Sequence, residues 1–201
     1  MPETTETTIL AAAKKVFIKK GYAGARMQAI ADEAGINKAM LHYYYRSKEK
    51  LFRVVFEQAM MGLIPKLDEA LSGNGSVVEK LEKVVRAYVA HIQENEHLPL
   101  FVLHEIAQNR IEFIASMKSK AARFPNFPQF FMQIIQEQEA GKIRAILPVH
   151  LLLNILGMVV FPFIAKPVFC NVIEIPEADF DSLMKDRADV IVDFMKNALT
   201  P

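Results

Sequence analysis

The sequence predicts an all-α protein, in which a three-helix helix-turn-helix head at the N-terminus is joined to a larger C-terminal helical bundle, with about nine helices in total. Apolar residues recur at intervals of three and four along most of the 201 residues, which is the spacing of one helical face. No alternating apolar and polar run has the length of an ordinary strand. The apolar fraction of 52% allows a sizeable core and argues against disorder.

The first two helices of the head are expected from apolar stripes that end at glycines. The first stripe runs from Ile9 to Phe17, and the threonines before it can cap the start of the helix. Gly21 is expected to end this helix. A second, shorter helix is expected over 27–34 and ends at Gly35, because glycine adopts the left-handed conformation without strain.

A third helix is expected over 37–44, with Asn37 as its N-cap. Two helices joined by such a short turn have the dimensions of a helix-turn-helix, whose second helix enters the major groove of DNA. At about 10 Å this helix is too short to be stable alone. Ile36, Leu41 and Tyr45 are therefore expected to anchor it from behind, which leaves the opposite face to solvent.

Charge is distributed unevenly between the two domains that we expect, residues 1–46 for the head and residues 47–201 for the bundle. Residues 1–50 carry nine Lys and Arg against five Asp and Glu, a net charge of +4, whereas residues 51–201 have a net charge of −3. A basic head on a mildly acidic body predicts that the head meets an anion, such as the phosphates of a nucleic acid.

The exposed face of the third helix provides the first candidate site. Lys38 can donate to guanine or to phosphate, and Ala39 and Met40 can contact a thymine methyl group. The histidine and tyrosines at 42–44 can donate to phosphates, and Lys48 joins its charge to the free N–H groups of the next helix start. Alternatively, this aromatic run is ordinary half-buried packing between two helices.

Residues 8–52 resemble the N-terminal domain of the TetR (tetracycline repressor) family of bacterial transcriptional regulators, through the stretch "GYAGARMQAIADEAGINKAMLHYYYRSKEKLF". The resemblance implies that Lys38, Ala39, Met40 and Tyr43 read bases, and that His42, Tyr44 and Lys48 contact phosphates. The whole DNA-binding set that we expect is Arg26, Gln28, Asn37, Lys38, Ala39, Met40, His42, Tyr43, Tyr44 and Lys48.

This chain departs from the usual family pattern at the start of the second helix and in the aromatic run. Ala25 and Arg26 stand where the family usually has a hydroxyl residue, so we expect Gly24 to act as a weak cap and Arg26 to reach a phosphate. His42 replaces a usual tyrosine, and Tyr45 replaces a usual phenylalanine.

The resemblance also implies that the C-terminal domain dimerises and binds a small-molecule inducer that releases the protein from a palindromic operator. Helices near 148–165 and 178–199 are the expected dimer faces, because both carry more apolar surface than one intramolecular contact requires. Alternatively, both helices fill the core of the monomer.

The inducer is expected to be apolar, because the candidate pocket residues are mostly aromatic and aliphatic. Polar residues within apolar runs, among them His91 and His150, are further candidates, although a single histidine more often has a core or surface role. The ligand-binding set that we expect is Phe101, His104, Phe131, Ile134, Asn154 and Met158.

An enzyme is not expected, because the sequence contains no Gly-rich phosphate loop, HExxH, GxSxG or CxxC motif, and we expect no metal and no cofactor. The single Cys170 excludes an internal disulfide and, with no secretory signal at the start, fits a cytoplasmic protein. Two alternatives remain, a helical DNA-binding protein without an effector and a membrane-associated protein. The uncharged stretch 145–165 could span a bilayer, but Pro162 and the polar Asn154 lie within it.

Overall fold

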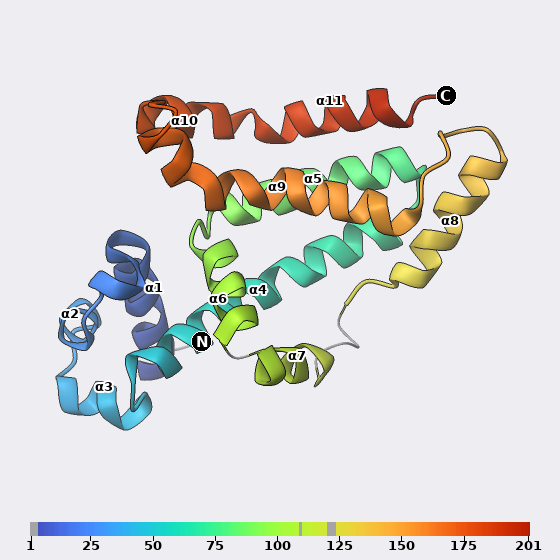
Figure 1. Ribbon diagram of the computed structural model, residues 1–201. Coiled ribbons are helices and arrows are strands. Elements are labelled where there is room, and N and C mark those ends of the chain that lie inside the picture. Colours follow the sequence, from blue (N-terminus) through green and yellow to red (C-terminus); the bar gives the residue numbers. More distant parts are fainter. Residues whose placement is uncertain (1–3, 109, 120–123) are drawn as a thin grey trace.

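The computed structural model describes residues 4–108, 110–119 and 124–201. Over these ranges the chain forms eleven helices and no strand (Figure 1). This confirms the all-α fold, with eleven helices where about nine were expected. The helices are α1 (Thr5–Gly24), α2 (Met27–Glu33), α3 (Lys38–Tyr44), α4 (Lys48–Ser72), α5 (Val77–Gln93), α6 (Leu98–Gln108), α7 (Arg110–Ser119), α8 (Phe127–Glu139), α9 (Pro148–Asn171), α10 (Glu177–Lys185) and α11 (Arg187–Leu199).

The head consists of α1, α2 and α3, which lie together at one end of the molecule (Figure 1). Gly21 breaks the regular helix as expected, with φ 64° and ψ 173°, although one more short turn follows before α1 ends at Gly24. Gly35 has φ +67° in the turn between α2 and α3, where the Ile36 N–H donates to the Ala31 carbonyl at 3.0 Å. The two helices of the expected helix-turn-helix are therefore confirmed within a residue or two.

The long helix α4 connects the head to the body and contributes side chains to both cores (Figure 1). Its first half supplies Leu51, Val55 and Phe56 to the head core, and its last turns supply Ala70 and Leu71 to the body core. The body core lies between α4, α5, α8, α9 and α11. Because one uninterrupted helix belongs to both clusters, the division at residues 46 and 47 stays a prediction.

Side-chain caps begin several of these elements. Thr4 caps α1, Ser47 caps α4, and Ser76 with Glu79 forms a complete capping box at the start of α5. In that box the Glu79 side chain accepts a hydrogen bond from the Ser76 N–H at 2.8 Å. These short polar motifs were readable from the sequence because each one satisfies N–H groups of its own helix.

The end of the chain differs from the expectation. The single helix predicted over 178–199 is two helices, α10 and α11, separated at Asp186. Phe180, Ile191 and Met195 are buried, whereas Leu183 and Phe194 are 57% and 63% exposed. Apolar spacing identifies a helix face without showing where the helix breaks or which neighbour covers it.

Helix α9 extends beyond residue 165 to Asn171 and has a mean hydropathy of 2.0 over its most apolar window. By length and composition alone it could cross a membrane. Leu151, Ile155 and Val159 bury one side of it in the body core, whereas Leu153 and Phe161 are more than half exposed. This helix therefore has a second apolar side that its own chain does not cover.

Candidate nucleic-acid interface and ligand cavity

The inner side of α3 anchors this short helix to the rest of the head. Asn37 caps it, since its Oδ1 accepts from the Met40 N–H at 2.7 Å. Leu41 is fully buried, and the Tyr45 hydroxyl donates to Glu6 Oε1 at 3.0 Å. Burial, and then the hydrogen bond to Glu6, raise the pKa of Tyr45, so its phenol stays neutral. One tyrosine of the run therefore packs inward, as the sequence indicated.

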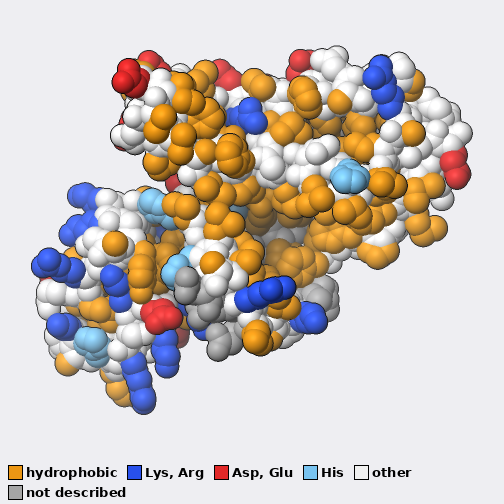
Figure 2. Space-filling view, in the orientation of Figure 1, with side chains coloured by type: hydrophobic (Ala, Val, Ile, Leu, Met, Phe, Trp, Pro, Cys, Tyr) orange, Lys and Arg blue, Asp and Glu red, His pale blue; other side chains and the backbone are white. Residues whose placement is uncertain are grey.

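The outer side of α3 is exposed and carries most of the expected DNA-binding residues. These are Lys38, Ala39, Met40, His42, Tyr43 and Tyr44. Tyr43 is 83% exposed, and its ring meets that of Tyr44 edge to face with 5.6 Å between centroids. Figure 2 shows Lys and Arg side chains gathered on the head, while hydrophobic side chains dominate the visible face of the body. A cationic, aromatic face of this kind suits a phosphate backbone.

Four residues of the expected DNA-binding set lie outside α3 or at its cap, namely Arg26, Gln28, Asn37 and Lys48. Gln28 donates to Asp32 Oδ1 at 2.8 Å, and the Asn37 oxygen is used by the cap. Arg26 is exposed and occupies the N-cap position of α2 without a capping hydrogen bond. The expectation that Gly24 caps α2 was therefore wrong, because Gly24 belongs to the end of α1.

Lys48 is held inside the head by partners that the sequence did not reveal. Its Nζ donates to the Tyr22 carbonyl at 2.8 Å and to the Ala25 carbonyl at 3.1 Å. The same ammonium lies 4.3 Å from the centroid of the Tyr22 ring. It thereby ties the start of α4 to the connection between α1 and α2, and one of its three N–H groups is left for a phosphate.

Replacing Lys48 with methionine is expected to lower the free energy of unfolding by about 1–3 kcal/mol, because two carbonyls lose a charged donor. DNA affinity should fall for all sequences alike, since the end of α1 is no longer held. Urea unfolding and fluorescence anisotropy measure the two effects. Lys50→Met on the exposed side of the same helix is the control. Unchanged stability in Lys48→Met would show that these hydrogen bonds contribute nothing.

An apolar cavity of about 250 Å³ lies in the body between α4, α5, α7, α8 and α9. Tyr88 contributes the one hydroxyl among its described lining residues. The lining consists of Met60, Leu63, Ile64, Leu67, Leu71, Leu81, Val84, Tyr88, Met117, Phe124, Phe127, Phe130, Phe131, Ile134, Pro148, Leu151, Leu152, Ile155 and Leu156. Such a wall accepts hydrocarbon or aromatic groups and offers little to a polar ligand.

Two of the six expected ligand-binding residues, Phe131 and Ile134, line this cavity, and the other four lie elsewhere. Phe101 packs in the head core against Phe56, with 5.1 Å between ring centroids. His104 and Asn154 are exposed, and Met158 packs against the body core outside the cavity. Apolar spacing marks both core and pocket residues, so it could not separate them. The contributions of α4 and α5 were missed for the same reason.

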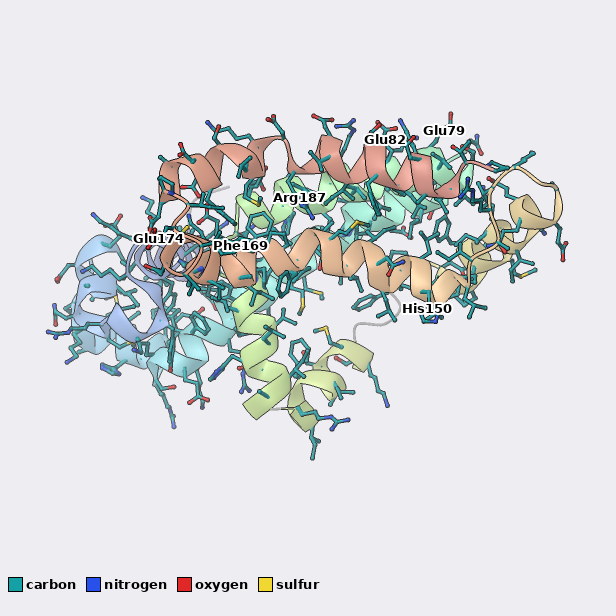
Figure 3. The ribbon with its side chains drawn as sticks, turned by 45° about the horizontal axis from the view of Figure 1, so that its top comes forward. Glu79, Glu82, His150, Phe169, Glu174 and Arg187 are labelled. Atoms are coloured by element: carbon teal, nitrogen blue, oxygen red, sulfur yellow. The ribbon has the colours of Figure 1, made fainter. Side chains whose placement is uncertain are left out.

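The two histidines named as further candidates, His91 and His150, also lie outside the lining of the cavity. His150 is exposed near the start of α9, and Arg187 lies between α9 and α11, where it donates to the Met158 carbonyl at 2.9 Å (Figure 3). His91 is buried, and its Nε2 is 2.7 Å from the Ala59 carbonyl, so this nitrogen carries the proton. Burial lowers the pKa of His91, and Lys66 adds to the effect.

The lowered pKa of His91 makes stability depend on pH. The unfolded imidazole binds a proton near its ordinary pKa of about 6.5, whereas the folded one binds it only at lower pH. The free energy of unfolding should therefore be constant above about pH 7 and fall as the pH decreases below about 6.5. Urea unfolding between pH 7.5 and 5.5 gives the free energy of unfolding at each pH. Its dependence on pH should be shallower in His91→Gln than in wild type and unchanged in His150→Gln. Equal slopes in all three proteins would contradict this.

The fold and the exposed α3 together define a helix-turn-helix protein whose head is joined through α4 to a larger helical body. The family model described as "Bacterial regulatory proteins, tetR family" matches residues 9–55, which span α1 to the first turns of α4. The head of the chain is therefore similar to the N-terminal domain of this family.

Named relatives agree with this assignment. The chain is 44% identical over 62 residues to the HTH-type transcriptional repressor SCO4008 of Streptomyces coelicolor, which covers 31% of this chain and 32% of the relative. It is 31% identical over 87 residues to the HTH-type transcriptional activator FasR of Mycolicibacterium smegmatis, covering 43% of this chain and 40% of that protein. The matched segments thus span two-fifths or less of these curated relatives.

The solved structure of HlyIIR, a hemolysin II transcriptional regulator, is similar over nearly the whole chain. It has a TM-score of 0.60 and 26% sequence identity, and the match covers 98% of this chain and 97% of HlyIIR. The similarity therefore extends through the body as well as the head.

Proposed function

We propose that this protein is a transcriptional regulator that binds duplex DNA through the outer face of α3. One observation carries this proposal: Lys38, His42 and Tyr43 are exposed together while Leu41 and Tyr45 fix the helix from behind. A solvated helix of two turns has no structural use for an 83% exposed tyrosine beside a lysine and a histidine. The relatives named as transcriptional regulators support the same reading.

Different residues of the head would have different roles on DNA. Lys38 and Tyr43 would read base edges, with Ala39 and Met40 approaching thymine methyl groups at the N-terminal end of α3. His42 and Tyr44, with Arg26 from the adjoining helix, would donate to phosphates and set the register. Because phosphate contacts release counterions, affinity should decrease steeply as the salt concentration rises.

A homodimer would place two such heads on one operator. The uncovered sides of α9 and α11 support this, since Phe161 and Phe194 are 59% and 63% exposed in the single chain. Two identical heads imply a palindromic operator with half-sites about one helical turn, or slightly more, apart.

A small apolar molecule in the cavity would act as the effector, most simply as an inducer that releases a repressor from DNA. Helix α4 supports this coupling, because Met60 and Leu63 line the cavity while Phe56, one turn earlier, packs in the head core. A ligand there contacts the helix on which the head rests. A regulator of this kind, with one free cysteine, Cys170, would work in the cytoplasm and would not be an enzyme.

The proposal is tested by replacing Tyr43 with alanine. Affinity for a duplex from the DNA beside its own gene should fall by about 5- to 150-fold, equivalent to 1–3 kcal/mol, while the midpoint of thermal unfolding stays the same. Fluorescence anisotropy at fixed salt measures the first and circular dichroism the second. Ile111→Ala, at an 84% exposed site on α7, is the matched control. Equal DNA affinity in wild type and Tyr43→Ala would remove α3 from the interface.

A further inference from the structure

Lys80 is a buried cation that has no acidic partner among the residues that the structure describes. It is 9% exposed, and its Nζ donates to Gln133 Oε1 at 2.8 Å. The nearest carboxylate along this network is that of Glu137, to which Gln133 Nε2 donates at 2.9 Å. Glu137 also accepts the Val77 N–H, at 3.0 and 3.1 Å from its two oxygens. Gln133 therefore separates the two charges, and Lys80 keeps N–H groups without a described protein acceptor.

The position of Lys80 in α5 makes an additional anion favourable. It lies four residues after the N-cap Ser76, near the positive end of the helix dipole. A buried ammonium in that field, with a neutral amide oxygen as its described acceptor, gains from any anion that reaches it. The Glu137 carboxylate lies just beyond Gln133 and repels further negative charge, so a ligand with one negative charge fits better than a ligand with two.

A polar groove of about 360 Å³ gives access to Lys80. Amide and hydroxyl side chains dominate its walls, and no acidic side chain is among its described lining residues. The lining consists of Leu71, Ser72, Lys80, Asn126, Gln129, Phe130, Met132, Gln133 and Gln136. Leu71 and Phe130 also line the apolar cavity, so the cationic groove and the hydrocarbon-lined cavity are neighbours that share these two side chains as a common wall.

We propose that the effector is an anionic amphiphile, an aliphatic or aromatic carboxylate whose anionic group pairs with Lys80 and whose apolar part occupies the cavity. This rests on the proposed function, since it names the chemical class of the effector. The apolar wall alone would accept any lipophilic molecule. The buried ammonium at its edge selects those with a negative end, because a neutral molecule of the same shape leaves Lys80 unpaired.

Calorimetric titration of the full chain with octanoate and with 1-octanol tests whether the site prefers a negatively charged ligand. The two compounds have the same chain length. Wild type should bind octanoate at least about tenfold more tightly than octanol. Lys80→Met should lose that preference and keep its affinity for octanol, whereas Lys80→Arg should retain most of it. Lys83→Met, on the exposed side of the same helix, is the matched control and should behave as wild type. Octyl sulfate in place of octanoate distinguishes a requirement for carboxylate from one for any monoanion.

Equal affinities for octanoate and octanol in wild type would overturn the proposal without any variant. An octanoate affinity that survives Lys80→Met would overturn it too, provided that circular dichroism shows a folded variant. If that variant does not fold, Lys80→Gln and Lys80→Arg make the comparison. Anisotropy with duplex DNA is recorded on the same samples. DNA binding without octanoate selection refutes this inference alone, and octanoate selection without DNA binding refutes the proposed function alone.

Discussion

Replacing Leu41 with alanine is expected to lower the free energy of unfolding by about 2–5 kcal/mol and to abolish high-affinity DNA binding. Leu41 is fully buried in the head core, where it holds a helix of only seven residues. The helix has one side-chain cap, Asn37, and is too short to be stable on its own. Removing its central anchor therefore leaves a cavity and frees α3 from the position that DNA binding needs.

Urea unfolding followed by circular dichroism measures the loss of stability, and anisotropy with duplex DNA measures the loss of binding. Met40→Ala, the neighbouring residue at 42% exposure, is the matched control and should change stability by less than about 0.5 kcal/mol. If Leu41→Ala bound DNA with wild-type affinity, the position of α3 could not depend on its buried side. If Met40→Ala were as destabilised as Leu41→Ala, the assigned faces of α3 would be wrong.

The head was predictable because its signals are local. Asn37 and Ser47 cap the helices that they immediately precede, and Gly35 adopts the positive φ that its turn requires. Each of these acts within a few residues of the chain. The hydrogen bonds of Lys48 to carbonyls more than twenty residues earlier were not predictable, since no local pattern encodes them. The sequence therefore indicated a charged group at this position but not its partners.

The body was predictable as helices but not as a site. Phe101 and Phe131 occur in similarly apolar stretches, yet the first packs in the head core and the second lines the cavity. That difference depends on which helices meet, and three-residue and four-residue spacing contains no such information. Lys80 shows the same limit, because in sequence it is one of two lysines on an amphipathic helix. Only the packing of α8 against α5 makes it a buried cation.

Introducing glutamate at both Phe161 and Phe194 is expected to convert the dimer into a monomer and to weaken operator binding by about 10²- to 10⁴-fold. In the single chain these side chains are 59% and 63% exposed, so a charge there does not disturb the fold of the protomer. In a dimer formed through α9 and α11 the same charges would be buried opposite their own copies. Once the heads are no longer linked, the second half-site loses the effective concentration that linkage provides.

Sedimentation equilibrium should show a mass near the 22.7 kDa of one chain for the double variant, and twice that mass for wild type. Thermal unfolding should be independent of protein concentration in the variant but not in wild type, because only an association that stabilises the fold depends on concentration. Met132→Glu, at a 61% exposed site on α8, places a charge on another apolar surface and should leave the dimer intact. A double variant that remained dimeric would exclude α9 and α11 as the interface, and the two heads would then have to be held by a different surface, such as the exposed apolar residues of α6.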